Sequence, residues 1–441
     1  MAGRFGTDGI RGEVGTAIDA PLAMALGRAV GARLAGSGRS VVLGRDTRRS
    51  GEMLSAALAA GLASTGTDAV DLGVVTTPCL VHASTDERHA AGIMVSASHN
   101  PAPDNGLKVV VDGRKVDDAT EAELDVLIDA PPGPGLANHG LGRLRDDRGA
   151  IDAYRRHLHE AAGDALAGMR IAIDCANGSA SMIAPQLFRA LGAQVTVLFD
   201  APNGVNINDG CGSTHPELLA ETVAAAGLDL GLAFDGDVDR LIAVDERGAL
   251  VDGDAVMGIC AIERLAAGTL RNSVLVATVM SNGGLERAVA QAGGRMVRTP
   301  VGDRHVFEAM EREDASLGGE QSGHIIFRDL ATTGDGMLTA IELIRSMRAA
   351  DAPLSELAAR IPRLPQVVLN SAARRRDEWR QDGDFAAAVE RATRAMGDRG
   401  RILVRPSGTE PKIRIMVEGD DANEIDRIAR ELATLAEARL N

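Results

Sequence analysis

The sequence of 441 residues is long enough for about three domains of ordinary size. Hydrophobic residues make up 45% and charged residues 25%, which is typical of folded proteins and excludes a chain that is disordered throughout. A net charge of −15 and an aromatic content of 7 Phe, 1 Tyr and 1 Trp disfavour phosphate backbones, stacked single-stranded bases and anionic membranes, so we expect no nucleic-acid or membrane partner.

The cysteine pattern and the N-terminus indicate a reducing compartment. The chain has four widely separated cysteines and no C-x-x-C pair: Cys79, Cys175, Cys211 and Cys260. This spacing predicts buried free thiols rather than a zinc or thioredoxin-like motif. The start, MAGRFGTDGIRG, lacks the pattern of a signal peptide, and no run of about 18 apolar residues predicts a membrane span. We therefore expect a cytoplasmic protein.

A pattern of strand, loop, helix and strand occurs three times, at 40–75, 169–200 and 272–301. In the second copy, for example, MRIAIDCANG is followed by SMIAPQLFRAL and then by AQVTVLFD. Short Val- and Ile-rich runs that alternate with helical stretches predict parallel strand pairs with helices covering the sheet. Each copy is followed by another apolar run that leads into a polar loop. Because ligands bind at the carboxyl ends of such strands, we expect these loops to share a cleft.

The pattern predicts an α/β protein with three similar domains of mixed or parallel sheets. A smaller C-terminal α+β domain completes the arrangement around a central cleft. The Pro/Gly-rich stretch at 130–140 and changes of rhythm near 251–254 and 363–366 mark the joins. The predicted domains are 1–150 with a serine loop, 151–252 with an acidic loop, 253–364 with a sugar-binding loop and 365–441 with a phosphate-binding loop.

The first loop, VSASHNP, places Ser98 directly after an apolar run and beside His99. Such a serine could be a nucleophile, a helix cap or the carrier of a phosphoryl group. No G-x-S-x-G motif surrounds it, which disfavours acyl-enzyme chemistry. Lys108, a little further on, is a candidate proton carrier, although an isolated lysine is more often solvated.

The second loop, FDGDVDR, contains Asp235, Asp237 and Asp239. At this alternate spacing three carboxylates can converge on one hard cation, and Mg²⁺ prefers such oxygen ligands. An acidic surface turn is less favoured, because the carboxylates would repel one another without a cation. An EF-hand register fits the three aspartates but fails at Arg240, where glycine is required, and at the flanks, where strands rather than helices are predicted. We therefore predict Mg²⁺ rather than Ca²⁺.

The last two loops predict contacts with a phosphorylated sugar. In GGEQSGH, Glu320 and Ser322 lie between glycines, so their oxygens could approach sugar hydroxyls. RPSGTEPKIR offers two guanidinium groups and several turn donors, which suit a phosphate. Its candidate residues are Arg405, Ser407, Gly408, Thr409 and Arg414. The alternative is an exposed turn between two strands.

Taken in order, several motifs resemble the α-D-phosphohexomutase superfamily over nearly the whole chain: FGTDGIRG, SASHNP, NINDGCGSTHPE, DGDVDR, GEQSGH, TTGDG and RPSGTEP. GEQSGH and CGSTHPE are most similar to the members that act on glucosamine phosphates. The resemblance implies a four-domain enzyme, with one active-site loop in each domain, that interconverts glucosamine 6-phosphate and glucosamine 1-phosphate. Its product would supply UDP-N-acetylglucosamine and peptidoglycan synthesis. It also implies a homodimer.

The resemblance implies a role for each loop. Ser98 would be phosphorylated in the active form, and a bisphosphorylated hexose would be the intermediate and the primer. The metal ligands would be Ser98 with its phosphoryl group and Asp235, Asp237 and Asp239. Residues matching Glu320 and Ser322 contact the sugar in this superfamily, and the RPSGTEP loop holds the phosphate that does not react.

Further roles are hypotheses. Arg11 and Arg240 would neutralise charge near the transferred group, and Lys108 or His99 would move the proton. One departure from the superfamily is His305, where GDRY is usual. A mutase for another hexose phosphate and a non-catalytic sensor of Ca²⁺ or a phosphosugar are the alternatives. A hinge near 363–366 would let the last domain close on the substrate.

Overall fold

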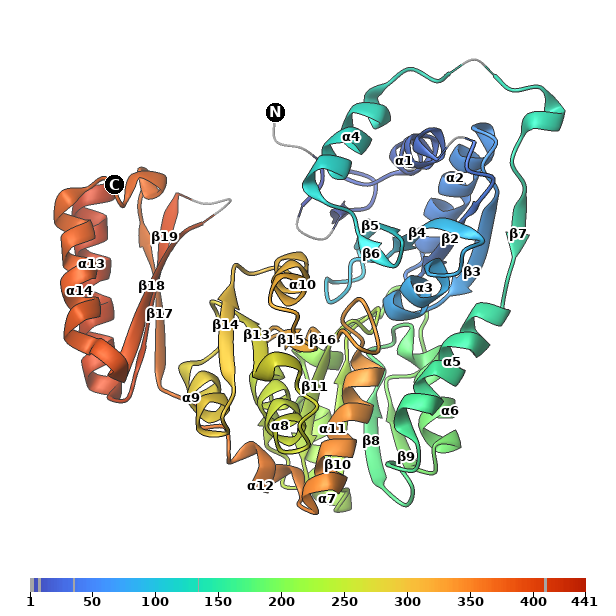
Figure 1. The fold of residues 1–441 in the computed structure, drawn as a ribbon. Coiled ribbons are helices and arrows are strands. Elements are labelled where there is room, and N and C mark those ends of the chain that lie inside the picture. Colours follow the sequence, from blue (N-terminus) through green and yellow to red (C-terminus); the bar gives the residue numbers. More distant parts are fainter. Residues whose placement is uncertain (1–3, 7–8, 35, 134, 408–410) are drawn as a thin grey trace.

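The computed structural model describes residues 4–6, 9–34, 36–133, 135–407 and 411–441. Three α/β domains follow one another along the chain, and a smaller C-terminal domain stands beside the third (Figure 1). In the part of the chain that is described, no helix is both long and apolar enough to cross a membrane.

The first domain is a mixed sheet with the strand order β1-β5-β4-β2-β3-β7 and with β6 beside β5. β4 is buried along its whole length, as expected for the apolar sequence HAAGIMV between two layers. The elements are β1 (Ile10–Glu13), α1 (Ala20–Arg33), β2 (Ser40–Arg45), α2 (Gly51–Ser64), β3 (Ala69–Val74), α3 (Thr77–Ser84), β4 (His89–Val95), β5 (Asp104–Val111), β6 (Arg114–Lys115), α4 (Asp118–Asp129) and β7 (Leu144–Asp146).

The second domain has the strand order β12-β11-β10-β8-β9. The helix that precedes it, α5, packs against α3 of the first domain and α11 of the third. The elements are α5 (Gly149–Ala162), β8 (Arg170–Asp174), α6 (Ala180–Ala190), β9 (Gln194–Leu198), α7 (Glu217–Ala226), β10 (Leu230–Phe234), β11 (Leu241–Asp245) and β12 (Leu250–Val251).

The third domain has the strand order β14-β13-β15-β16. Its long helix α11 is almost wholly buried and lies beside the second domain (Figure 1). The elements are α8 (Gly253–Ala266), β13 (Val274–Thr278), α9 (Gly283–Gln291), β14 (Arg295–Thr299), α10 (Asp303–Arg312), β15 (Leu317–Gly319), β16 (Ile325–Phe327), α11 (Gly336–Ala350) and α12 (Leu354–Ala358).

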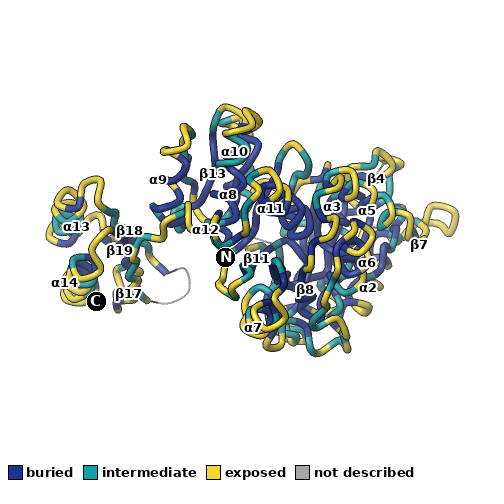
Figure 2. The backbone as a smooth tube through the Cα atoms, turned by 90° about the horizontal axis from the view of Figure 1, so that it is seen from below, coloured by how far each residue is buried: buried dark blue, intermediate teal, exposed yellow. Residues whose placement is uncertain are grey.

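The C-terminal domain is an antiparallel sheet of order β17-β19-β18 with two helices on one face. It has a hydrophobic core of its own and forms a separate lobe next to α9 and α12 (Figure 2). The elements are β17 (Gln366–Ala372), α13 (Gly383–Met396), β18 (Gly400–Pro406), β19 (Lys412–Gly419) and α14 (Ala422–Leu440).

The threefold repeat predicted from the sequence is confirmed. In each of the first three domains a strand, helix and strand form a parallel pair, and the next strand pairs parallel on the other side. The sheets share the order β3-β2-β4-β5, β9-β8-β10-β11 and β14-β13-β15-β16, in which the fourth strand is antiparallel. The predicted fold class is therefore confirmed.

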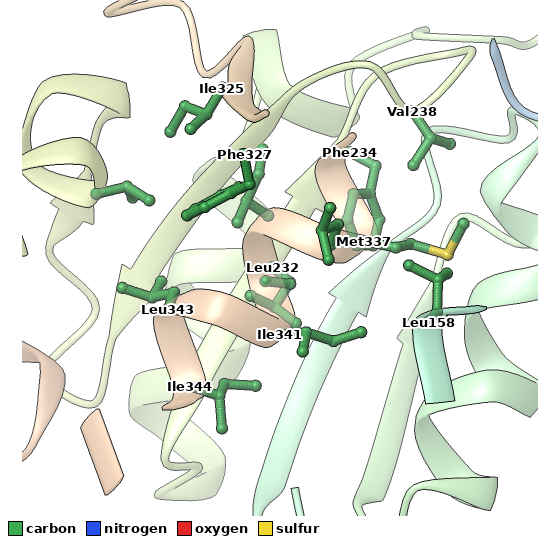
Figure 3. Close-up of a cluster of buried hydrophobic side chains, with 14 of the residues drawn as sticks. Leu158, Leu232, Phe234, Val238, Ile325, Phe327, Met337, Ile341, Leu343 and Ile344 are labelled. Carbon is green, nitrogen blue, oxygen red and sulfur yellow. The ribbon is translucent and has the colours of Figure 1, made fainter. Parts of the chain in front are cut away.

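One hydrophobic core joins the second and third domains. Leu232 and Phe234 of β10 face Met337 and Ile341 of α11, and Phe327 of β16 lies beside them (Figure 3). The loops that leave β10 and β15 are consequently anchored in the same core. The prediction for the cysteines is also confirmed, since all four are buried and free.

Candidate functional site

The loops after β4, β10 and β15 leave equivalent strands of the three related sheets and carry the predicted site residues. The backbone N–H of Leu241 donates to Gly323 O at 3.0 Å, which ties the acidic loop to the sugar loop. Gly236 approaches the serine loop so closely that an added Cβ would lie 2.7 Å from Ser98 O. The three loops thus meet, as the repeat predicts.

The serine loop holds Ser98 in a left-handed conformation, with a φ of 52°. Such a conformation costs a non-glycine residue about 1–3 kcal/mol, so its surroundings must hold it in place. The Ser98 carbonyl accepts hydrogen bonds from the buried Arg48 at 3.0 Å and from Asn208 of the second domain at 2.9 Å. The Ser98 N–H donates to Ser96 Oγ at 2.9 Å. No described helix follows Ser98, so it is not a helix cap.

The three aspartates of the second loop are all buried, and a carboxylate oxygen of each lies within 4.8 Å of the others. Burial raises the pKa of Asp235 well above its usual range, and the neighbouring Asp239 and Asp237 raise it further. The Oδ1 atom of Asp237 is buried and accepts no hydrogen bond from the described residues. Crowded carboxylates with an unused buried oxygen fit a bound cation, which would remove their repulsion. The flanking β10 and β11 are strands, so the EF-hand alternative is wrong.

The serine and acidic loops are in direct contact. Ser98 Oγ donates a hydrogen bond to Asp235 Oδ2, although the two residues are 137 positions apart. His99 Nδ1 lies 3.3 Å from the same Oγ atom. Burial lowers the pKa of His99 to about 4, and the nearby Arg240 and Arg11 contribute, so the imidazole is neutral at pH 7. The sequence prediction that Ser98 and the carboxylates meet in space agrees with this geometry.

Lys108 lies on β5 and is only 2% exposed, so it is not a solvated surface group. Its ammonium lies 2.8 Å from Asp237 Oδ2 and 3.4 Å from Asp239 Oδ2. The first domain therefore places a positive charge against the acidic loop of the second domain, where it partly neutralises the carboxylates.

A cavity of about 310 Å³ opens beside these loops. Its described lining comes from the first three domains and includes the predicted residues Arg11, His99, Asp239, Arg240 and Glu320. Arg11 donates to the side chain of Asn100 at 3.2 Å, which holds the arginine against the serine loop. Two cations, a neutral imidazole and carboxylates around one cavity suit a ligand that carries both phosphate and hydroxyl groups.

Three further residues with ionisable side chains line the cavity but were not predicted from the sequence: Lys115, Asp303 and His324. The Asp303 carboxylate pairs with Lys115 and lies 3.4 Å from His324 Nε2. Asp303 precedes His305 in GDRH, where the superfamily usually has GDRY, and His324 ends the motif GEQSGH. Their position within those motifs was the available signal.

Ser322 and His305 of the third domain do not line the cavity, unlike Glu320. Glu320 Oε1 accepts the Gly302 N–H at 2.9 Å, and Ser322 Oγ donates to Glu320 Oε2 at 3.3 Å. Ser322 thus supports Glu320 and is not part of the described lining. His305, which replaces the usual tyrosine, has a side chain 39% exposed and lies 3.7 Å from Glu308. It does not line the cavity either.

The phosphate-binding candidates of the last domain lie apart from this cavity. Arg405 and Arg414 are cross-strand neighbours on β18 and β19. They alternate with Val404, Ile413 and Ile415 of the core, so they project from the sheet face opposite the helices. Ser407 follows β18, whereas Gly408 and Thr409 lie outside the described residues. No described residue of this domain lines the cavity, so the structure does not bring Arg405, Ser407 and Arg414 together with Ser98 in one pocket.

Four family models match successive parts of the chain. Their descriptions are phosphoglucomutase/phosphomannomutase alpha/beta/alpha domain I at residues 2–131, domain II at 152–248, domain III at 252–364 and the C-terminal domain at 368–435. A phosphoglucosamine mutase of Symbiobacterium thermophilum is 51% identical, and the match covers 100% of both chains. One from Moorella thermoacetica is 48% identical over 99% of each chain.

Solved structures share the fold of the chain over its whole length. A phosphoglucomutase/phosphomannomutase family protein of Burkholderia thailandensis has a TM-score of 0.85 at 28% identity and covers 100% of this chain and 99% of its own. An N-acetylphosphoglucosamine mutase of Aspergillus fumigatus, solved with GlcNAc-6P and magnesium, has a TM-score of 0.70 at 18% identity, with 99% of this chain and 96% of its own covered. The chain belongs to the phosphoglucomutase/phosphomannomutase family.

Proposed function

We propose that this chain is a phosphoglucosamine mutase, which interconverts glucosamine 6-phosphate and glucosamine 1-phosphate through a phosphoserine at Ser98. The observation that carries the proposal is the hydrogen bond from Ser98 Oγ to Asp235 within a buried cluster of three carboxylates. The three acidic groups alone do not give the serine hydroxyl a catalytic function. Esterified with phosphate and bridged by a cation, it becomes a phosphoryl donor. Similarity over the full length to proteins named phosphoglucosamine mutase supports the choice of sugar.

Asp235, Asp237 and Asp239 would hold Mg²⁺ together with an oxygen of the phosphorylated Ser98. When bound, Mg²⁺ supplies positive charge to the phosphoryl oxygens. Lys108 neutralises the remaining carboxylate charge, and Arg11 and Arg240 line the adjoining cavity, where they favour an anionic sugar phosphate. We prefer Mg²⁺ to Ca²⁺ because the loop between two strands offers few ligands beyond the carboxylates.

In the transfer, the bond between Ser98 Oγ and phosphorus breaks, and a bond between the free sugar hydroxyl and phosphorus forms. The hydroxyl proton ends on Oγ, and the neutral His99, 3.3 Å from that atom, is the group placed to exchange it. The product of this step is a bisphosphorylated hexose. After it turns around, its other phosphate returns to Ser98, which restores the phosphoserine.

The unreacted phosphate would bind to Arg405, Ser407 and Arg414, with Gly408 and Thr409 completing the loop, and Glu320 and Ser322 would contact the sugar. Because the described part of the C-terminal domain lies outside the cavity, that domain must approach the other three when the substrate binds. The proposed hinge at 363–366 comprises the end of the connection after α12 and the first residue of β17. We also propose that the protein is cytoplasmic, because its four free buried cysteines stay reduced there. We propose a homodimer as well, which size-exclusion chromatography with light scattering would test.

The purified protein tests the proposal in two measurements. Mass spectrometry should find a peptide containing Ser98 that is about 80 Da heavier than its sequence, and Ser98→Ala should lack it. Coupled assays should show faster turnover of glucosamine 1-phosphate than of mannose 1-phosphate or glucose 1-phosphate, and none in Ser98→Ala. Faster turnover of mannose 1-phosphate would instead indicate the alternative, a mutase for another hexose phosphate. Full activity of Ser98→Ala would refute the phosphoserine, and a protein with neither turnover nor phosphate would be a sensor.

A further inference from the structure

The first residue of α3 crosses a domain boundary to reach the acidic loop. The Thr77 N–H donates to the carbonyl of Asp237 at 2.9 Å, and Thr77 Oγ donates to Asp237 Oδ2 at 2.5 Å. Thr77 is 2% exposed and Asp237 is fully buried, so water does not compete for these bonds. The residues are 160 positions apart and belong to different domains.

The start of a helix explains why Thr77 can do this. The first N–H groups of a helix have no partner within it, so they are available to neighbouring segments. Thr76 caps α3 by accepting the Cys79 N–H, which fixes the first turn and leaves the Thr77 N–H directed at the loop. Pro78 in the same turn lacks an N–H and adds no competing donor.

The two oxygens of the Asp237 carboxylate have different surroundings. Oδ2 receives both Thr77 Oγ and Lys108 Nζ, at 2.5 and 2.8 Å, from two elements of the first domain. Oδ1 accepts no hydrogen bond from the described residues although it is buried. Two donors on one oxygen fix the rotation of the carboxylate and leave the other oxygen for a cation.

We propose that Thr77 is a positioning residue for the metal site: its hydroxyl and N–H orient Asp237 so that Oδ1 points at the cation, at a fixed distance from Ser98. This inference rests on the proposed function, since it assumes that the carboxylates bind a divalent ion. Thr77 and Ser98 both belong to the first domain, whereas the aspartates belong to the second. The bonds of Thr77 therefore set the position of the ion relative to the phosphoserine.

The experiment measures metal binding directly, without substrate. Mn²⁺, which serves as a paramagnetic probe, is titrated into the full-length wild type, Thr77→Val, Thr77→Ser and Ser84→Ala, and free Mn²⁺ is followed by electron paramagnetic resonance. Removing a hydrogen-bond partner of a metal-ligating group typically weakens metal affinity about 10–100-fold. Thr77→Val should show that loss, while Thr77→Ser, which keeps the hydroxyl, should stay within about threefold of the wild type.

Ser84→Ala is the matched control, because Ser84 is an equally buried residue at the other end of α3 whose hydroxyl donates to Val81 O and does not bond to Asp237. It should lower the melting temperature but leave Mn²⁺ affinity unchanged. In the mutase assay, Thr77→Val should raise the Mg²⁺ concentration for half-maximal rate more than it lowers the rate at saturating Mg²⁺.

Unchanged Mn²⁺ affinity in Thr77→Val would overturn the inference, as would an equal loss in Ser84→Ala, which would indicate a general disturbance of α3. If Thr77→Val is unfolded by circular dichroism, the serine variant decides, since a tenfold loss there would contradict a role for the hydroxyl. A wild type that binds no Mn²⁺ would instead refute the metal site of the proposed function.

Discussion

One arginine of the C-terminal domain makes two hydrogen bonds across the joint with the third domain. Arg401 on β18 donates to Glu418 Oε1 at 2.8 Å and also to the carbonyls of Val279 and Ser281, at 2.8 and 2.6 Å, which lie after β13 in the third domain. Glu418 is 1% exposed, and its Oε1 also accepts the Gly283 N–H at 2.8 Å. Groups of both domains thus bond to the pair of Arg401 and Glu418, and Arg287 of α9 forms a second ion pair across the joint with Asp420.

Arg401→Met removes the positive charge and leaves the Glu418 carboxylate buried in the joint. Removing one partner of a buried pair costs about 3–5 kcal/mol. The Arg401 side chain is 24% exposed, so water can partly replace it, and we expect the lower end, about 3 kcal/mol. At 1.4 kcal/mol per factor of ten, that is roughly a 100-fold change in the equilibrium constant. In Arg401→Met/Glu418→Gln no charge is left buried, and the amide still accepts the Gly283 N–H, so most of the loss should be recovered.

The C-terminal domain carries its own probe, because Trp379 is the only tryptophan in the chain and lies in the core of that domain. Urea unfolding followed by Trp379 emission should give a destabilisation of about 3 kcal/mol for Arg401→Met and about 1 kcal/mol for the double variant. A displaced phosphate-binding loop should also raise KM for glucosamine 6-phosphate more than it changes kcat. A loss below about 0.5 kcal/mol, the usual range of surface substitutions, or a double variant no more stable than Arg401→Met, would refute this reasoning.

Two further predictions concern the body formed by the first three domains, where Tyr154, the only tyrosine, reports on unfolding. Burial raises the pKa of Asp335 to about 6, so the folded state binds this proton more tightly than the unfolded state. As the pH falls from 7 to 4, the wild type should therefore gain about 2 kcal/mol of stability relative to Asp335→Asn, and a constant difference would contradict the shift. Phe234 is fully buried between the second and third domains, and Phe234→Ala should cost about 3–5 kcal/mol in urea unfolding; a loss under about 1 kcal/mol would mean that the two domains share no core.

The sequence was sufficient for the repeated sheets and for the loops that end their strands. Alternation of apolar runs with helical stretches is a local pattern, and parallel strand pairs follow from it because such a pair needs a crossover connection. The contact between Ser98 and Asp235 could therefore be predicted, since equivalent strand ends of related sheets were expected to share a cleft. The alternate spacing of Asp235, Asp237 and Asp239 likewise predicted that their carboxylates could converge on one cation.

Contacts between domains that follow no repeat could not be predicted. Lys108 resembles any isolated lysine in sequence, and its burial is explained only by Asp237, 129 positions away. Arg48, in a segment without a recognised motif, and Asn208, in NINDGCGSTHPE, support the strained backbone of Ser98. The motif gave no indication of that contact. The role of Thr77 could not be predicted either, because its partner, Asp237, lies in another domain. Such residues emerge only when the packing of the domains is known.

The placement of the C-terminal domain separates the site into two physically different parts. The loops carrying Ser98, Asp235 and Glu320 are held by apolar cores and by backbone hydrogen bonds across the loops, which resist displacement because it would expose buried surface. The hairpin of β18 and β19, which we propose binds the unreacted phosphate, belongs to a domain whose own core is separate and whose joint includes charged hydrogen bonds such as those of Arg401. Charged groups can exchange such partners for water at small net cost when a domain moves. The fold therefore fixes the reacting groups relative to one another and allows the C-terminal domain to adjust its position around the unreacted phosphate. A sugar that must turn around between two phosphoryl transfers requires both properties.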